Sequence, residues 1–445
     1  MRPLCPLGLV ALIAGCASYT ERTAHALRDF ESGHFDEAFR SYSDREQVDS
    51  AFLSGAEAGT VALAAGEWQQ AREQFHLAAE ASKEIEGRAL AGPEELGETL
   101  ASWVINDTAR AYEGEGFERV YLHCGLAMTY LAAGLMDDVY VEARLANELL
   151  ESEEKLYETH YEAGGWGHLL SAVTYELLGQ PDDAYIDYQR MEEKGVGTAL
   201  AGRALVRLAK ALHRDDELAH WEERYGPDID RPPQAAMVVV LAAVGLGPYK
   251  VEGILPVPTP DGLFKMAVPT YQDRPQPVTS LQLVAKESGY AVGTELVERV
   301  SKVARENLED RLLWIAAKSV ARGLLKRELT KQLEDEYDIA GRIAGDLFTW
   351  FSERADVRGW TTLPDSYQAC RLFVPPGVHG FRLEAVGGNA VELGDFELDA
   401  GETMLVFART LDTRIYAHVI GGKPVGNVPG HEATLASGSQ QAGSP

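Results

Sequence analysis

The segment GLMDDVYVEARLA, residues 134–146, has three counterparts in the chain, and together they decide the fold. Each begins with a glycine, which can end a helix in the left-handed conformation. Five positions later comes a small residue, or Val139 in this segment, where close packing of the next helix is expected. The pattern predicts short helices joined in pairs by glycine turns. The counterparts are GHFDEAFRSY from Gly33, GEWQQAREQFHLAA from Gly66 and GQPDDAYIDYQRM from Gly179.

The position nine residues after the glycine is aromatic in three segments, as Tyr42, Phe75 and Tyr188, and Ala143 takes it in the other. With this spacing the set resembles the tetratricopeptide repeat, whose unit is about 34 residues. Successive glycines are 33, 68 and 45 residues apart, so a longer insert is expected near residues 157–167. The resemblance implies a solenoid that offers a concave surface to a protein or peptide. The alternative is an irregular helical bundle with glycine stops.

The sequence pattern changes after Tyr225, where the helical periodicity ends at GPDIDRPPQ, a segment rich in proline and aspartate. Short apolar β-type segments follow, on both sides of a long helical pattern that Thr294 can cap. The fold class predicted is α+β multidomain, with an all-α tetratricopeptide-like solenoid followed by an antiparallel β-sandwich that carries an inserted helical hairpin. The predicted divisions are 1–15 signal peptide, 16–225 helical repeats, 226–236 linker, 237–424 sandwich, about 294–356 helical insertion, and 425–445 disordered tail.

The amino terminus contains Leu12-Ile13-Ala14-Gly15-Cys16, which resembles the lipobox of bacterial lipoproteins. The apolar run before it is far shorter than the roughly 20 residues that a spanning helix needs, and it fits an export signal. The resemblance implies cleavage before Cys16 and acylation there, palmitate included. Ala17 follows in place of the aspartate of inner-membrane lipoproteins, so we expect an outer-membrane anchor facing the periplasm. A plain secretory signal with a chance cysteine is the alternative.

The charge of the chain narrows its partners. The formal net charge is −28 over 445 residues, and removing residues 1–15 takes away only Arg2, which leaves −29. So acidic a surface repels nucleic acid, and we expect no nucleic-acid partner. Cys124 and Cys370 remain after Cys5 leaves and Cys16 is acylated. We expect two free buried thiols, although an exported protein could pair them.

Catalytic signatures are missing from the sequence, which has no Gly-x-Ser-x-Gly, Walker A or HExxH motif. Residues 112–120, YEGEGFERV, imitate a phosphate loop, but Arg119 stands at the third glycine position and two acids lie where phosphate would bind. We therefore expect a turn between helices there, and no catalytic residue or cofactor. Four polar residues could in principle bind a metal, but Gly164-Gly165 interrupts the helix, and we expect surface polar residues there instead. The four residues are Glu158, His160, Glu162 and His168.

The long helical pattern places four basic residues on one side of a helical wheel, opposite an apolar side that includes Leu312 and Val320. Such a helix can lie on anionic lipid or contact an acidic partner. The alternative, which we favour, is that the apolar side packs on the sandwich and the basic side is solvated or paired with the chain's own acids. The basic residues are Arg311, Lys318, Arg322 and Lys326.

Several phrases together resemble an uncharacterised family of bacterial outer-membrane lipoproteins with tetratricopeptide-like repeats, often encoded near peptidoglycan-synthase activator lipoproteins. They include YEGEGFERV, VEAR at 141–144, VVVLAAVGLGPYK at 238–250 and WTTLP at 360–364. The resemblance implies a protein-binding scaffold or regulator in cell-envelope assembly, with an envelope protein or peptide as partner. The alternatives are an envelope glycan-binding protein, or a hydrolase with a site where the solenoid meets the sandwich.

Overall fold

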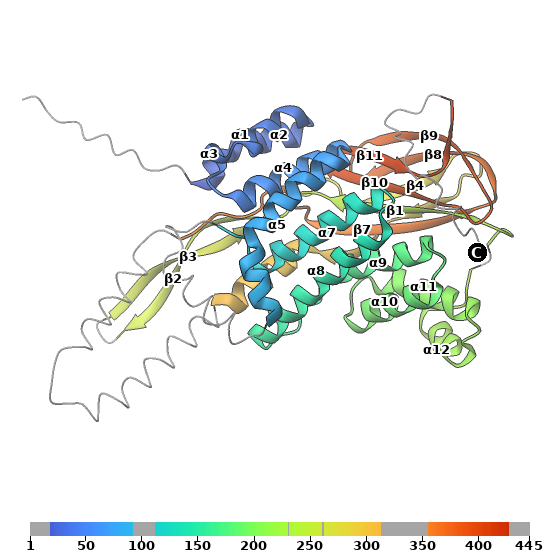
Figure 1. Ribbon diagram of the computed structural model, residues 1–445, viewed down its shortest axis with the longest axis horizontal. Helices are drawn as coiled ribbons and strands as arrows, with labels where there is room; N and C mark the ends of the chain where they lie inside the picture. Colours follow the sequence, from blue (N-terminus) through green and yellow to red (C-terminus); the bar gives the residue numbers. More distant parts are fainter. Residues whose placement is uncertain (1–17, 92–111, 230, 260–261, 313–354, 427–445) are drawn as a thin grey trace, which may run out of the picture.

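The computed structural model describes residues 18–91, 112–229, 231–259, 262–312 and 355–426 (Figure 1). The helices are α1 (Tyr19–Ser32), α2 (Phe35–Ser43), α3 (Arg45–Val48), α4 (Ala51–Ala65), α5 (Trp68–Ala91), α7 (Gly116–Ala132), α8 (Met136–Tyr157), α9 (Gly165–Leu177), α10 (Pro181–Glu193), α11 (Thr198–Ala211) and α12 (Asp215–Tyr225). The strands are β1 (Ala236–Val244), β2 (Tyr249–Thr259), β3 (Gly262–Gln272), β4 (Ser280–Ala285), β5 (Ala291–Gly293), β6 (Glu295–Arg299), β7 (Ser366–Val374), β8 (Gly377–Val386), β9 (Ala390–Leu398), β10 (Thr403–Leu411), β11 (Arg414–Ile420) and β12 (Lys423–Val425).

The helices form pairs at the predicted glycines. Gly33, Gly66, Gly134 and Gly179 all have positive φ, between 67° and 83°, which glycine adopts without steric strain. The residues five positions later are fully buried, and so are those at the ninth position, apart from 1% exposure at one of them. The insert expected near residues 157–167 is the connection between α8 and α9. The tetratricopeptide-like packing of the helical part is confirmed by this burial.

The strands form two five-stranded sheets and one separate ribbon. The inner sheet has the order β11-β10-β1-β7-β6, and the outer sheet has the order β12-β9-β8-β4-β5. Within the part of the chain that the structure describes, β2 pairs with β3 alone. The β2–β3 ribbon extends away from the body of the molecule (Figure 1). The two five-stranded sheets share a hydrophobic core, to which both contribute buried side chains such as Val240 and Phe381.

Strand β1 shows how the layers are joined. Its sequence AMVVVLAAV is apolar throughout, and all nine residues are buried. Because side chains alternate between the faces of a strand, Val239 and Leu241 join the core shared with the helices, whereas Val238 and Val240 join the core shared with the outer sheet. The inner sheet is therefore covered on both faces, which explains a continuous apolar strand where alternation is usual.

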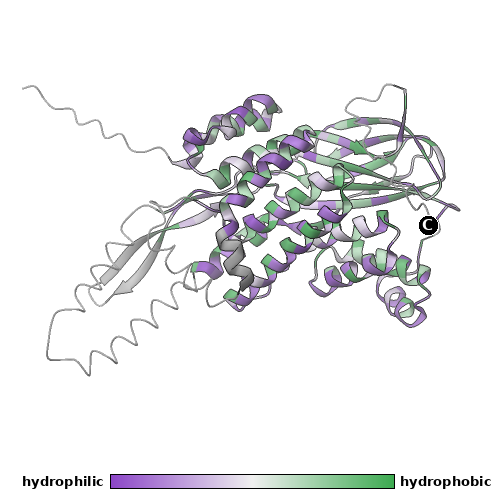
Figure 2. Ribbon diagram, in the orientation of Figure 1, coloured by the Kyte–Doolittle hydropathy of each residue, from purple (hydrophilic) through white to green (hydrophobic). Residues whose placement is uncertain are grey.

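The helices cover the free face of the inner sheet (Figure 1). The first helices α4, α7 and α9 are buried over most of their length, and α11 buries one side, whereas the second helices alternate buried and exposed positions. Hydrophilic and hydrophobic residues alternate along the second helices α8 and α10 (Figure 2). One side of the helical layer is thus closed by the chain's own sheet. An open surface for a partner is therefore expected only on the other side of the helical layer, which the second helices form.

Two predictions about the β-rich part were wrong in detail. The pairing is not wholly antiparallel, because β1 pairs with β10 in parallel, from Met237 opposite Thr403 to Ala243 opposite Arg409. Thr294 does not cap a helix. Its hydroxyl accepts from Leu281 N and donates to Gln368 Oε1, and β6 follows it. The helical pattern there begins only at residue 300, because β6 is held by pairing with β7.

Candidate functional site

The helix–sheet junction is the zone where α4, α7 and α9 meet the inner sheet and the segment 356–365 that precedes β7. The sequence leaves open a catalytic or glycan-binding site at this place. The junction contains carboxylates that are almost completely buried, which is unusual because an isolated buried charge is strongly destabilising. The donors around each carboxylate therefore show what it does.

Glu57 lies on α4 and is fully buried. Its carboxylate accepts from the backbone N–H groups of Thr361 at 2.6 Å and Thr362 at 2.9 Å. The hydroxyls of Thr361 and Tyr19 each donate at 2.8 Å. Burial raises the pKa of Glu57, and these hydrogen bonds offset part of that rise. A helical side chain thus fixes the backbone of the segment that leads into β7.

Glu118 on α7 binds the backbone of the same segment one residue earlier, at Trp360. It accepts from Trp360 N at 2.7 Å and from the Tyr112 hydroxyl at 2.7 Å. It also accepts from Glu115 N at 3.0 Å, which closes a capping box at the start of α7. Burial raises the pKa of Glu118 as well. Three consecutive backbone amides, those of residues 360 to 362, are therefore held by two helical glutamates.

Glu298 reaches in the opposite direction, from β6 to the helices. Its carboxylate accepts from Gly164 N at 3.1 Å and Trp166 N at 2.8 Å, at the start of α9, and from the Tyr121 hydroxyl at 2.8 Å. An acceptor at a helix N-terminus satisfies N–H groups that have no partner within the helix. Burial raises the pKa of Glu298. The hydrogen bonds across the junction therefore run both ways.

Glu115 is a fourth buried carboxylate, and it has cationic partners. Its side chain pairs with Lys250 of β2 and with Arg311, whose Nη1 lies 2.7 Å away. Burial alone would raise the pKa of Glu115, but these two charges outweigh burial and hold it below its usual value. Lys250 also donates to Arg358 O at 3.0 Å. Arg311 thus points into the junction and contacts the chain's own acid.

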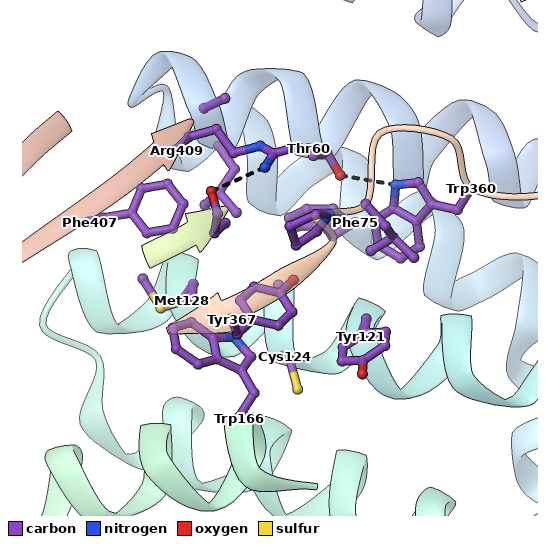
Figure 3. A pocket seen from close by; sticks show the side chains of 16 residues that line it. Thr60, Phe75, Tyr121, Cys124, Met128, Trp166, Trp360, Tyr367, Phe407 and Arg409 are labelled. Carbon is purple, nitrogen blue, oxygen red and sulfur yellow. Dashed lines mark hydrogen bonds between the residues drawn. The ribbon is translucent and has the colours of Figure 1, made fainter. Parts of the chain in front are cut away.

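The cavities at the junction are small. One, of about 20 Å³, lies between Trp166, which stacks on Tyr367 at 4.4 Å, and Trp360, whose ring nitrogen donates to Thr60 (Figure 3). Another of about 20 Å³ lies beside Glu118 and Lys250. That volume accommodates about one water molecule. Neither of these two cavities has room for a sugar or another small-molecule substrate, and the carboxylates described above are already hydrogen-bonded within the chain.

Arg409 of β10 lines the cavity between Trp166 and Trp360. It is 1% exposed, and its guanidinium donates to the carbonyls of Ala243 and Thr362, each at 3.1 Å (Figure 3). Burial lowers its pKa to about 9. Arg409 therefore joins β1 to Thr362, whose backbone N–H donates to Glu57.

The residues considered as a metal cluster do not converge. Glu162 pairs with Lys302, and His160 lies 3.6 Å from Glu154. His168 is buried, and its Nδ1 lies 2.8 Å from Asp187 Oδ1. Within the described residues, no group of three or more His, Cys, Asp or Glu side chains is arranged to hold a metal ion.

Other predicted site residues are placed only in part. Cys16, Lys318, Arg322 and Lys326 lie outside the described residues. Cys124 and Cys370 are both free and buried, as predicted, and burial raises the pKa of each, to about 12 for Cys370. In the described part of the chain, none of the helices combines the length and the apolar character that crossing a bilayer requires.

An exposed surface follows the turns between first and second helices, and we call it the tyrosine rim. Tyr140 of α8 is 38% exposed and its ring lies 5.6 Å from that of Tyr175 at the end of α9. Tyr130, at the end of α7, lies under the guanidinium of Arg72 at 5.3 Å. Exposed apolar residues flank these rings. They are Leu135, Val141 and Leu178.

The rim repeats with the helix pairs. Tyr130 and Tyr175 both stand four residues before a helix-stop glycine, and Arg72 and Tyr140 both stand six residues after one. In each case the residue six positions after one helix-stop glycine contacts the tyrosine that precedes the next such glycine. Arg72 contacts Tyr130, and Tyr140 contacts Tyr175. A buried pair repeats in the same way, as His123 with Glu142 at 2.6 Å and His168 with Asp187 at 2.8 Å.

Sequence reasoning missed the glutamates as a set. Glu115 and Glu118 were noticed only as acids that spoil a phosphate loop, and Glu57 was not noticed at all. The signal that could have found Glu57 is its position within FLSGAEAGTVALAA, an otherwise apolar stretch. An acid that would sit on the buried side of a helix needs donors, and these had to come from elsewhere in the chain.

The helix pairs define a tetratricopeptide-like repeat layer. The comparisons do not assign this chain to a family. No family model matches the chain, and no curated protein matches it. The crystal structure of MamA protein is 13% identical, with a TM-score of 0.29, over 46% of this chain and 89% of that one. At so low a TM-score the likeness carries no argument, and the repeat assignment rests on the glycine stops and the burial described above.

Two further solved structures match to a similar extent. A thermophilic TPR protein in Thermus thermophilus is 16% identical, with a TM-score of 0.25, over 47% of this chain and 90% of that one. A Podosopora anserina putative kinesin light chain with nearly identical TPR-like repeats is 16% identical, with a TM-score of 0.28, over 46% and 91%.

Proposed function

We propose that this chain is a protein-binding scaffold or regulator of cell-envelope assembly, anchored in the outer membrane through acylated Cys16 and facing the periplasm. Residues 16–225 form its repeat domain, and the two five-stranded sheets of residues 237–424 form a sandwich domain. Residues 226–236 link the two domains, and the residues after 424 form a tail.

The observation that carries the proposal is the asymmetry of the helical layer. One side is closed by the inner sheet and held there by Glu57, Glu118 and Glu298. The other side exposes aromatic and aliphatic residues, including Tyr140 and Val141. Repeat layers bind partners through extended surfaces, and exposed aromatic residues are enriched where proteins meet.

The rival role, a hydrolase or glycan-binding protein with a site at the junction, finds less support. A raised carboxylate pKa inside a protein is a common sign of an acid–base site. Here Glu57 and Glu118 accept hydrogen bonds from backbone amides of the chain, and the cavity beside Glu118 accommodates about one water molecule. The raised pKa values therefore follow from burial in a structural contact.

The proposal is tested by crosslinking in intact cells, followed by purification of the tagged full chain from the envelope. We expect the wild-type chain to fractionate with the outer membrane, to incorporate a fatty-acid analogue and to bring down a specific envelope protein. Cys16→Ser should lose the label and appear in the soluble periplasmic fraction.

Two outcomes would contradict the proposal. One is a wild-type chain that carries no label and fractionates as the Cys16→Ser variant does. The other is purified protein that turns over cell-wall material while no partner is enriched, because that result would place catalysis ahead of scaffolding.

A further inference from the structure

A contact within the chain, between Arg72 and Tyr130, indicates which side chains the tyrosine rim can bind. Arg72 stacks its guanidinium on Tyr130, with 5.3 Å between the guanidinium carbon and the ring centroid. The next unit repeats the tyrosine as Tyr175 but places Tyr140 where Arg72 stood. In that unit the position equivalent to Arg72 carries no cation, although Arg144, one turn further along α8, contacts the Tyr140 hydroxyl. Both rings are only partly covered.

The rim is also acidic. Asp137 and Asp138 begin α8, and Asp182 and Asp183 begin α10; all four are exposed. Asp182 pairs with Arg214, whereas the other three have no ion-pair partner within the described residues. Burial, with the nearby charges of Glu142 and Asp138, raises the pKa of Tyr130. Burial, the Tyr140 hydroxyl and the charges of Asp187 and Asp183 raise the pKa of Tyr175. Tyrosine faces and carboxylates therefore occupy one surface.

These two features select the same kind of side chain. A guanidinium is planar, stacks on tyrosine and donates to carboxylates through a fork of N–H groups. A lysine ammonium is a point charge that satisfies the carboxylates but stacks less well. The strongly acidic net charge of the chain, −28, also favours approach of a cationic segment.

We propose that the tyrosine rim binds an arginine-bearing segment of the partner protein, with guanidinium groups stacked on Tyr140 and Tyr175, pairing with Asp183 beside Tyr175, and with Asp138 adding attraction on the Tyr130 side. The proposal rests on the proposed function and names the chemistry of the partner. Leu135, Val141 and Leu178 supply the apolar contacts beside the stacked arginines.

The test uses the purified full chain and a fluorescent peptide of alternating arginine and serine, with the matching lysine peptide as comparison. We expect the arginine peptide to bind more tightly, measured by fluorescence anisotropy at low and at physiological salt. Tyr140→Leu combined with Tyr175→Leu keeps apolar side chains but removes the ring faces. This variant should weaken binding between about 5-fold and about 30-fold.

A matched pair of variants separates charge pairing at the rim from overall attraction. Asp138→Asn with Asp183→Asn removes two charges at the rim, and Asp399→Asn with Asp412→Asn removes two exposed charges from turns of the sheets. We expect the first pair to weaken binding severalfold and the second to change it less than about twofold. Thermal unfolding of every variant confirms that the fold is retained.

The proposal is overturned if the wild-type chain does not bind the arginine peptide, if the lysine peptide binds equally well, or if both aspartate pairs act alike. These failures differ from failure of the scaffold proposal. A partner crosslinked in cells with no arginine binding at the rim would remove this inference alone. Arginine binding with no partner in cells would instead remove the proposed function.

Discussion

At the scale of single residues, Glu57 carries the argument. It is a carboxylate inside an apolar helix, and it is stable there only because four donors from distant parts of the chain surround it. Three of these donors belong to Thr361 and Thr362, about three hundred residues later in sequence. One side chain therefore joins the helical layer to the segment that enters the inner sheet.

Glu57→Ala should lower the free energy of unfolding by about 3 kcal/mol, because it leaves two buried backbone amides and a tyrosine hydroxyl without an acceptor. The measurement is chemical denaturation of the purified chain. Glu67→Ala, at an exposed position between α4 and α5, is the control and should change stability by less than about 0.5 kcal/mol. Equal effects of the two changes would contradict the role given to Glu57.

Glu298 makes a prediction about pH. Burial raises its pKa in the folded protein above the value in the unfolded chain, so the folded state takes up a proton first as pH falls. Its contribution to stability is therefore fully present below the unfolded pKa and is lost as pH rises through the folded pKa. Glu298→Gln is neutral at every pH and lacks this dependence.

The difference in free energy of unfolding between wild type and Glu298→Gln should shift in favour of the wild type as pH is lowered from neutral towards the unfolded pKa of about 4.3. Denaturation at a series of pH values measures it, and the effect of net charge cancels because both proteins share it. A difference that stays constant, or that moves the other way, would show that burial does not control this carboxylate.

At the scale of the helix pair, the turn after the first helix is the element that repeats. Gly134 and Gly179 adopt positive φ there, and His213 occupies the same place after α11 with φ of 55°. In each turn the following residue donates its backbone N–H to the carbonyl five residues earlier. The left-handed conformation is therefore required by the turn even where the residue is not glycine.

Gly179→Ala should destabilise the chain by about 1 to 2 kcal/mol through strain alone, since no atom lies within 4 Å of the added methyl group. His213→Gly should do the reverse and stabilise it by about 0.5 kcal/mol, the relief of strain less the entropy of a new glycine. Thermal unfolding compares the two. Changes of the same sign in both would show that the turn does not impose positive φ.

Local patterns predicted the elements well and their assembly less well. The glycine stops, the small residues after them and the apolar strands β1 and β10 follow from residues close together in sequence. The parallel pairing of β1 with β10, and β6 in place of a helix cap at Thr294, depend on partners far away in the chain. The glutamate contacts at the helix–sheet junction could not be predicted for the same reason, because the amides that explain Glu57 come from residues 361 and 362.

At the scale of the whole molecule, the layers decide which surface a partner can reach. The first helices lie against the inner sheet, the inner sheet lies against the outer sheet, and the second helices form the exposed side of the helical layer (Figure 1). The junction between helices and sheet is closed, and its buried carboxylates accept hydrogen bonds from backbone amides of the chain. The outer side of the helical layer therefore offers the surface on which the scaffold proposal depends.

The most direct test is site-specific photocrosslinking in cells from two exposed valines. Val141 of α8 lies on the outer side of the helical layer and is 57% exposed; Val378 of β8 lies on the outer sheet and is 53% exposed. With a photoreactive phenylalanine analogue at each position in turn, we predict a specific crosslinked envelope protein from position 141 and none from position 378. Crosslinks from position 378 alone, or from neither position, would contradict the account.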